Sequence, residues 1–398
     1  MTIRKLVKVL VVGTADAYRA AEDALTALKC MDVTEVARGE HHFLADGWLP
    51  QVWFEELRFI LERGTGGRVT VVWDESVDPA VTVAPVSLEN PRLARPFETF
   101  VELFSLPGRE GYDPTFLTFL ILPIFFGFVI GDFGYGIVFV IAGWYVRRRF
   151  RTPVAELAST LTIAGGIWSI VFGLFVFAEF FAFHADVGPL SLHLLDRLED
   201  VPQLLLLSIG FGLVHLALGL AIGFLYEHRR AGLRAAVLRK FSWLVLEGGF
   251  VLLGLGVLGL LTGPVWIPAV TLIAFAVTLI SLGGGIVDVV EVPAFIGNIF
   301  SYLRLGILGI AESVLGLALN TIVGEGLLTQ GIVGWVVGGA VFVVGHGFVM
   351  ALLLLTVSIH SLRLHYVEFY TKFYPIEEIG QYRRFEPTVK ARTGPGEA

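Results

Sequence analysis

Charged residues are scarce in this chain. Aspartate, glutamate, lysine and arginine make up 16% of its 398 residues, whereas a soluble domain usually carries about 25%. The mean hydropathy is +0.75. Several runs of largely apolar residues exceed the length of about 18 residues that a bilayer core demands. These properties predict an integral membrane protein.

The chain has a single cysteine, and it lacks the sequence motifs of several enzyme classes. The single Cys30 excludes an intrachain disulfide and a cysteine metal cluster. The chain lacks GxxxxGK[ST], HExxH and GxSxG motifs, so no ATP-hydrolysing site, metal or other cofactor is predicted. The net charge of -7 gives no indication of nucleic-acid binding. Movement of an ion is therefore a better expectation than bond chemistry.

The first part of the chain differs from the rest because charged residues alternate there with short apolar segments. Strands are predicted at 7–13, 32–38, 41–48 and 67–74, with helices at 15–29 and 49–64. The order βαββαβ is typical of a small α+β ferredoxin-like lobe. We expect this lobe at 1–80, a connector at 81–114, a transmembrane domain at 115–374 and a tail at 375–398.

Apolar runs fill the transmembrane region, at 115–146, 155–183, 202–226, 241–262, 264–287, 292–324 and 330–370. The first is interrupted by glycines (Gly131, Gly134, Gly136) around Asp132, which predicts two short helices with Asp132 in a capping or interfacial role. Arginines follow the first and third runs, and basic loops face the cytoplasm. No signal peptide is visible. We therefore expect eight transmembrane helices in the cell membrane, with both termini cytoplasmic.

Arg304 is the most conspicuous residue of the transmembrane region. It lies more than two helical turns from either end of an apolar run, where an arginine costs about 2.5–3.5 kcal/mol. A carboxylate, water or a functional partner must offset that cost; the alternative is a structural ion pair. Glu312 follows about two turns later, as an internal partner, a proton-relay group or a neutralised structural residue.

Further polar residues lie in or near the apolar runs. Arg363 is near the inner end of the last run, where its side chain could reach the interface, and His360 lies one turn before it on the same face. Glu179 and Glu247 are expected to line a polar access path. His346 is a candidate for the same ion path, and its alternative role is that of a hydrogen-bonded packing residue.

Four segments resemble a known family. SYLRLGILGIAES (301–313), which includes Ser301, Tyr302 and Arg304, resembles the penultimate-helix motif of the V/A-type ATPase a/I subunit. HSLRLHYVEFYTKFY (360–374) resembles the last helix of that family. RPFETFVELFSLPGREGYDPT (95–115) and FFGFVIGDFGYGI (125–137) resemble the family's entrance to the membrane domain.

The resemblance implies a stator subunit with eight transmembrane helices, the last two long and tilted beside a rotor ring. Arg304 would face the ion-binding carboxylate of the ring and separate two aqueous half-channels for H⁺ or Na⁺, with Arg363 in support. Because a guanidinium keeps its proton, it favours release of the proton from a passing carboxylate. The implied partners are a ring of c/K-type subunits, a d/C-type collar, E/G-type peripheral stalks and the lipid bilayer.

The sequence departs from the family in three places. Eukaryotic members carry histidine where Glu312 stands, and glutamate where this chain has Leu353. The family's N-terminal arm is long, whereas here the distal part is missing between the first strand and Gly47-Trp48-Leu49-Pro50. The resemblance therefore implies weakened binding to the peripheral stalks. Two other interpretations stay open: a standalone secondary transporter or channel, and a non-transporting membrane scaffold.

Overall fold

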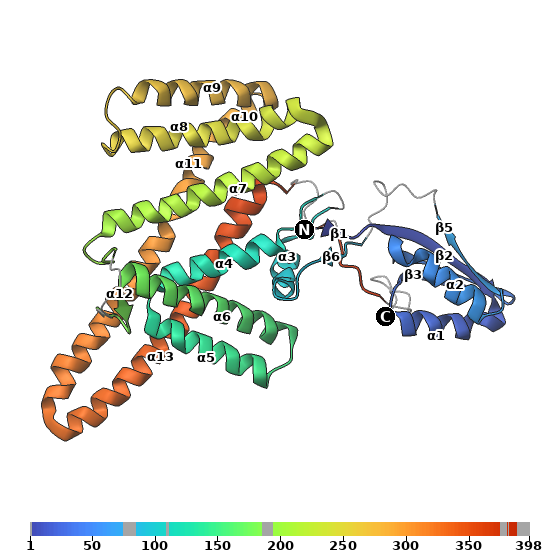
Figure 1. Ribbon diagram of the computed structural model, residues 1–398, viewed down its shortest axis with the longest axis horizontal. Coiled ribbons are helices and arrows are strands. Elements are labelled where there is room, and N and C mark those ends of the chain that lie inside the picture. Colours follow the sequence, from blue (N-terminus) through green and yellow to red (C-terminus); the bar gives the residue numbers. More distant parts are fainter. Residues whose placement is uncertain are drawn as a thin grey trace. The chain divides into compact units, whose positions relative to one another are not determined.

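The computed structural model describes residues 2–74, 85–108, 111–184, 194–374, 380 and 382–387. The chain divides into two compact units. The first contains Met1–Pro91, Phe100–Asp113 and Pro375–Ala398, and the second contains Arg92–Thr99 and Pro114–Tyr374. Figure 1 shows that the first unit is built around a β-sheet and that the second is helical.

The first unit has the predicted βαββαβ order. Its elements are β2 (Leu6–Thr14), α1 (Tyr18–Leu28), β3 (Asp32–Arg38), β4 (His42–Pro50), α2 (Phe54–Gly64) and β5 (Val69–Trp73). The strands are ordered β3-β4-β2-β5 and every neighbouring pair is antiparallel. A short pair, β1 (Thr2–Ile3) and β6 (Leu88–Glu89), is also antiparallel. This is the topology of a ferredoxin-like sandwich.

The core of the first unit follows from the two periodicities of its elements. Alternate residues of a strand share a face, and residues three or four apart share a face of a helix. The buried residues that meet in this core include residues of β2 (Val7, Val9, Val11), α1 (Ala21, Leu25), α2 (Leu57, Leu61) and the other strands of the sheet (Val33, Ala45, Val71).

A segment from the far end of the chain completes the first unit. Val86 pairs with Arg384 in a parallel bridge, through hydrogen bonds from Val86 N to the Arg383 carbonyl and from Phe385 N to the Val86 carbonyl, both 2.8 Å. Nη1 of Arg383 lies 2.5 Å from Oδ2 of the fully buried Asp32. Phe385 also packs against the buried Leu6 and Trp48. The segment 382–387 is thus part of this fold.

Helices make up the second unit. They are α4 (Thr115–Ile130), α5 (Phe133–Arg149), α6 (Pro153–Phe172), α7 (Val201–Ala236), α8 (Ser242–Val257), α9 (Trp266–Gly284), α10 (Ile286–Val290), α11 (Val292–Phe300), α12 (Leu303–Thr321) and α13 (Gly331–Arg363). A wide helical turn, η4 (Gly173–Phe177), ends α6 and leads into a short pair of strands, β7 (Glu179–Phe180) and β8 (Phe183–His184). Another turn, η9 (Leu364–Phe369), continues α13, and η10 (Tyr370–Lys372) follows it. The short α3 (Glu98–Phe104) spans the sequence boundary between the units.

The predicted break in the first apolar run is confirmed. α4 ends at Ile130, and the following Gly131 has a φ of 42°, in the left-handed region that favours glycine. Asp132 then caps α5, because its Oδ1 accepts a hydrogen bond of 2.9 Å from Tyr135 N. The glycine and the carboxylate therefore divide one apolar run into two short helices.

Four helical stretches among the described residues are long and apolar enough to cross a membrane: Pro153–Phe177, Val201–Val257, Trp266–Gly284 and Ile286–Lys372. Thr115–Ile130 is apolar but shorter. The stretch Val201–Val257 has a non-helical residue at Gly232, with φ 86° and ψ 173°. The last stretch folds back near Gly331, and α12 and α13 form a hairpin in Figure 1. The fold is that of a mostly helical membrane protein with a small sheet-containing N-terminal unit.

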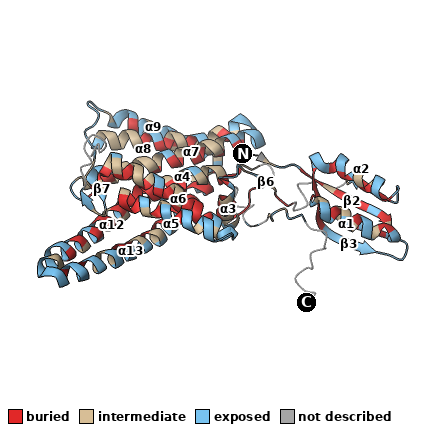
Figure 2. Cartoon of the chain, turned by 60° about the horizontal axis from the view of Figure 1, so that its bottom comes forward, coloured by how far each residue is buried: buried red, intermediate tan, exposed pale blue. Residues whose placement is uncertain are grey.

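The hairpin of α12 and α13 has a broad exposed surface, and Figure 2 shows exposed residues along its outer end. The large apolar residues exposed on it include Ile307, Val314 and Leu317 of α12 and Phe348, Leu352, Leu355 and Ile359 of α13. An exposed apolar surface of this kind is suited to lipid or to another apolar subunit.

Candidate functional site

Arg304 is the second residue of α12, and its side chain is half-buried. The start of the helix is anchored by Tyr302, which is fully buried and whose hydroxyl lies 2.8 Å from Nδ1 of His215 on α7. Nη1 of Arg304 is enclosed, yet it has no hydrogen-bond partner among the residues that the structure describes. The cost of placing this cation in an apolar helix is therefore not offset by a direct ion pair within the described chain.

The structure brings Arg304 close to the end of α13. Arg304 interacts electrostatically with Arg363 and with Glu368, and His360 interacts with both arginines. Arg363 is exposed, His360 is half-buried and Glu368 of η9 is buried. Ser301, the residue two positions before Arg304, interacts with Glu368 through its side chain. Arg304, Arg363 and Glu368 therefore interact electrostatically at this end of the hairpin, without a direct ion pair among the described residues.

Glu312 does not pair with Arg304, which rules out the internal partnership that the sequence left open. Its carboxylate instead lies 2.6 Å from Nη1 of Arg197. Eight residues of α-helix rotate a side chain by about 80° beyond two full turns. This rotation carries Glu312 onto the buried face of α12, where it is 2% exposed, beside Gly309 and Ser313.

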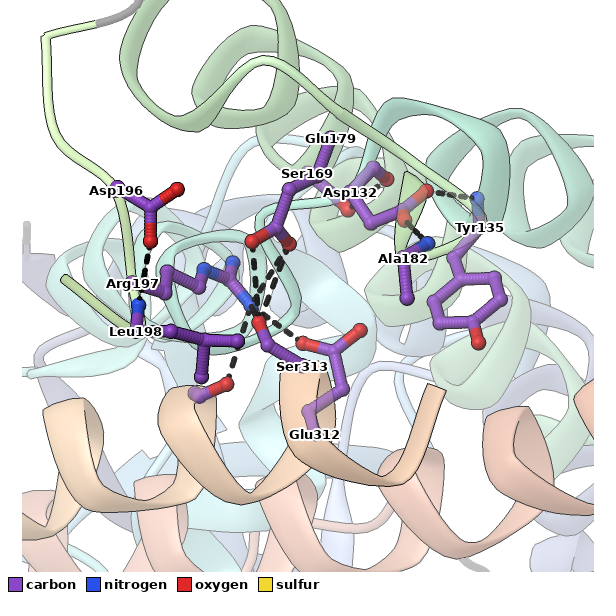
Figure 3. Close-up of polar contacts among 11 residues, drawn as sticks. Asp132, Tyr135, Ser169, Glu179, Ala182, Asp196, Arg197, Leu198, Glu312 and Ser313 are labelled. Atoms are coloured by element: carbon purple, nitrogen blue, oxygen red, sulfur yellow. Dashed lines mark hydrogen bonds and ion pairs between the residues drawn. The ribbon is translucent and has the colours of Figure 1, made fainter. Parts of the chain in front are cut away.

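Arg197 was not identified from the sequence as a site residue, although its side chain is completely buried. Figure 3 shows it between two glutamates: Nη1 lies 2.6 Å from Oε2 of Glu312 and 3.5 Å from Oε2 of Glu179. The same Nη1 is 3.3 Å from Oγ of Ser313. Ser313 in turn donates to Oε1 of Glu179 at 3.1 Å. We refer to Arg197, Glu179, Glu312 and Ser313 as the Arg197 cluster.

The segment that carries Arg197 is held by backbone hydrogen bonds. Leu194 N and Leu195 N donate to the carbonyl of Val176 in η4, at 2.9 and 3.0 Å. Oδ1 of Asp196 accepts from Leu198 N and Glu199 N, at 2.7 and 2.9 Å. These contacts fix the direction in which the arginine side chain enters the helical unit.

Two further residues shape the space that the guanidinium occupies. It lies over the ring of Phe177, with 4.3 Å between Cζ and the ring centroid, which is a cation–π geometry. On another side it packs against Gly131, where an added Cβ would overlap Nη2. The sequence signal for this site was weak because the other charged residues of the segment around Arg197 are acidic, a mixture that is typical of a polar loop.

His346 lies in the buried interior of the second unit, and both of its ring nitrogens are within hydrogen-bond distance of a neighbour. It is 2% exposed. Its Nδ1 lies 2.6 Å from the hydroxyl of Tyr135, and its Nε2 lies 3.0 Å from Oδ1 of Asn320. This contact links the glycine-containing motif of α5 to α12 and α13.

The remaining motif residues have packing roles. A Cβ added at Gly136 would lie 2.7 Å from the carbonyl of Gly166, so this glycine permits the close approach of α5 and α6. A Cβ added at Gly134 would meet the ring of Phe181 at 2.7 Å. At both positions, any larger residue would clash with the neighbouring backbone or aromatic ring.

Glu179 and Glu247, which were expected to line one path, lie in different groups. Glu247 of α8 is 4% exposed and interacts electrostatically with Lys372 and Tyr302. It therefore belongs with the residues around the start of α12, whereas Glu179 belongs to the Arg197 cluster. Within the described ranges, no group of three or more histidine, cysteine, aspartate or glutamate side chains could hold a metal ion.

Known proteins similar to this chain are named subunit I of A-type or V-type ATP synthases. The chain is 30% identical over 376 residues to the A-type ATP synthase subunit I of Thermococcus kodakarensis, which covers 90% of this chain and 55% of the relative. It is 29% identical over 337 residues to the A-type ATP synthase subunit I of Methanothermobacter thermautotrophicus, covering 83% and 50%. No protein-family model matches the chain.

A bacterial relative extends the comparison. The V-type ATP synthase subunit I of Borreliella burgdorferi is 24% identical over 306 residues, covering 70% of this chain and 49% of the relative. The chain thus spans about half the length of the curated relatives that it matches. The chain belongs to the subunit I family of the A-type and V-type ATP synthases, and it matches about half of the length of these family members.

Proposed function

We propose that this chain is the membrane stator subunit of a rotary V/A-type ATPase, in which Arg304 separates two half-channels for H⁺ or Na⁺. One observation carries the proposal. Arg304 is a half-buried cation at the start of α12, and its Nη1 has no hydrogen-bond partner among the described residues. A cation retained in such a place needs a partner from outside the described chain.

The surface around Arg304 is suited to an apolar ring of helices. Ile307 and Val314 are exposed on α12, at 54% and 49%, and Ile359 is exposed on α13 at 56%. A carboxylate on a passing helix would meet Arg304 at the edge of this apolar surface. The guanidinium keeps its positive charge under all physiological conditions, so it favours the deprotonated carboxylate and repels cations that would leak directly across.

Polar residues on both sides of this position could form the two half-channels. Glu312 lies eight residues beyond Arg304, or about 12 Å along the helix axis, and is joined to Glu179 through Arg197. On the other side, Glu247 is near Tyr302. The ion path that we propose therefore uses Glu179 and Glu312 at one end, and Glu247 and His360 at the other, with Arg363 in support.

The proposed assembly contains a rotor ring of c/K-type subunits, a d/C-type collar and E/G-type peripheral stalks, in a lipid bilayer. The test is ATP-driven H⁺ or Na⁺ uptake by the complete complex in vesicles, with assembly followed by co-purification. Arg304→Gln and Arg304→Lys should both abolish coupled uptake while the ring still co-purifies, because glutamine has no charge and lysine can lose its proton when desolvated. Arg363→Gln should be less severe because Arg363 is exposed.

The matched control is Arg151→Gln, which removes an exposed arginine that follows α5, and uptake should stay unchanged. Coupled uptake by an assembled Arg304→Gln complex would contradict the stator function. Failure of any rotor ring to co-purify with the wild-type chain would instead favour a standalone transporter or a scaffold.

We also propose eight membrane crossings, with both termini in the cytoplasm. In a Cys30→Ala background, a cysteine at the exposed Glu199 should react with an impermeant reagent added outside cells. A cysteine at the exposed Ala231 should react only after permeabilisation. External labelling at Ala231 would refute this topology.

A further inference from the structure

The Arg197 cluster contains one cation and two acids. Arg197 and Glu312 have 0% and 2% exposed side chains, and that of Glu179 is 13% exposed. Buried charges need partners of opposite sign, and one guanidinium balances only one carboxylate. With both glutamates ionised, the cluster would hold one uncompensated negative charge.

The neighbouring charged groups make that excess larger. Asp132 is fully buried, and its two oxygens accept hydrogen bonds from backbone amides of Tyr135 and Ala182, at 2.9 and 2.7 Å. Asp196, beside Arg197 in sequence, accepts from two backbone amides. Amide donors stabilise a carboxylate in its ionised form. Asp132 interacts electrostatically with both glutamates, and Asp196 interacts with Glu179.

The distances distinguish the roles of the two glutamates. Glu312 is closest to Arg197, at 2.6 Å, which is a charge-assisted contact. Glu179 is further away, at 3.5 Å, and is the more exposed of the two. The ion pair therefore belongs to Arg197 and Glu312, and Glu179 is left with the hydroxyl of Ser313.

The guanidinium also has unused donors. Nε and Nη2 of Arg197 are buried and have no hydrogen-bond partner among the residues that the structure describes. A fully buried arginine with two unused nitrogens indicates that further acceptors, such as water molecules, belong in this site. Water would also give a proton a way to reach Glu179.

We propose that the Arg197 cluster is a proton-holding site, in which Glu179 carries one proton while Glu312 stays ionised against Arg197. Arg197 acts as a positioning residue, because it decides which of the two carboxylates is the anion. A proton arriving through water binds a carboxylate oxygen of Glu179 and leaves from the same oxygen. The role of this proton in transport rests on the proposed function, whereas its presence does not.

The test is the infrared C=O stretch of protonated carboxyl groups, recorded at neutral pH on the purified full-length chain. Glu179→Gln should remove one such band, because the proton-bearing group is gone. Glu312→Gln should remove the same band, because Glu179 then becomes the counter-ion of Arg197 and ionises. Arg197→Gln should add a second band, since neither glutamate keeps a cation.

The matched control is Glu325→Gln, which removes an exposed glutamate after α12 and should leave the band unchanged. A wild-type spectrum in which neither glutamate substitution removes a band would overturn the proposal. So would a band that disappears in one of the two glutamate variants and persists in the other. If Arg197→Gln does not fold, the two glutamate variants still decide the matter.

The infrared result is independent of rotation. Suppose that the band is lost in both glutamate variants and that the wild-type chain binds no rotor ring. The proton-holding site would then be supported, and the stator function would be contradicted. In a transporting complex, both glutamate variants should also change the pH dependence of uptake without loss of assembly.

Discussion

The hydroxyl of Tyr135 lies 2.6 Å from Nδ1 of His346, a residue 211 positions further along the chain. Tyr135 is fully buried and His346 nearly so. The other ring nitrogen of His346 lies 3.0 Å from Oδ1 of Asn320. One histidine thus connects α5, which carries the glycine-containing motif, with α12 and α13, which carry Arg304 and His360.

Removal of the Tyr135 hydroxyl should destabilise the second unit. Tyr135→Phe leaves Nδ1 of a buried histidine without a partner, which typically costs about 1–3 kcal/mol. The measurement is thermal unfolding of the purified chain in detergent. Tyr145→Phe is the control, because Tyr145 is on the same helix and 59% exposed. Equal stability of the two variants would show that the contact with His346 contributes nothing.

Substitution of Gly131 should damage the Arg197 cluster as well as the helix break. Gly131→Ala places a side chain at a left-handed φ, at a cost of about 1–2 kcal/mol, and its Cβ would overlap Nη2 of Arg197. We expect a lower unfolding temperature and loss of the ion pair with Glu312. Gly254→Ala is the control, because a Cβ there has nothing within 4 Å. A Gly131→Ala chain as stable as this control would contradict the packing described for Arg197.

The ion pair between Asp32 and Arg383 should stabilise the first unit. Arg383→Gln leaves a fully buried carboxylate without its cation, and we expect a loss of about 1–3 kcal/mol. Arg4→Gln is the control: its pair with Glu89 is exposed, at 45% and 41%, and such pairs contribute about 0–1 kcal/mol. The measurement is pulse proteolysis across a urea series, and equal losses would argue against a structural role of Arg383.

The single cysteine should be unreactive in the folded chain. Burial raises the pKa of the Cys30 thiol to about 11, and the thiolate is the reactive form. At pH 8, alkylation should be at least about 100-fold slower than for an unstructured cysteine near pKa 8.5. An Ala20→Cys chain supplies the control, since Ala20 is exposed on α1.

The raised pKa of Cys30 also makes the folding stability of the chain depend on pH. Well below pH 8.5 the thiol is protonated in both the folded and the unfolded chain. As the pH rises towards 11, the unfolded chain loses the proton first, so the contribution of Cys30 to folding stability falls. Rapid alkylation of native Cys30 at pH 8 would contradict its burial.

Local patterns were sufficient to predict much of this fold. The strands and helices of the first unit follow from period-two and helical spacing, and the break at Gly131 and Asp132 follows from a glycine beside a capping residue. Arg197 could not be found in this way. Its role depends on Glu179 and Glu312, which are brought together by tertiary packing, and no local pattern distinguishes it from an arginine in a polar loop.

The same limit applies to the pairing of Glu312. Helical spacing gives the distance between Glu312 and Arg304 along α12, but it does not say which face meets another segment. The structure shows that the face with Glu312 receives Arg197, while Ile307 and Val314 are exposed. The family resemblance identified the segments that form α12 and α13. Only the packing around these helices shows that Glu312 pairs with Arg197 and not with Arg304.

The contact of residues 382–387 with the first unit also determines the order in which the chain can fold. The ribosome synthesises the strands of the first unit before any helix of the second, yet Arg383 and Phe385, which complete that unit, leave the ribosome after α13. The first unit is therefore begun first and finished last. A chain whose synthesis stops within the transmembrane region keeps Asp32 without its arginine, and cellular quality control can distinguish such a product from a full-length chain by the incomplete folding of a segment made hundreds of residues earlier.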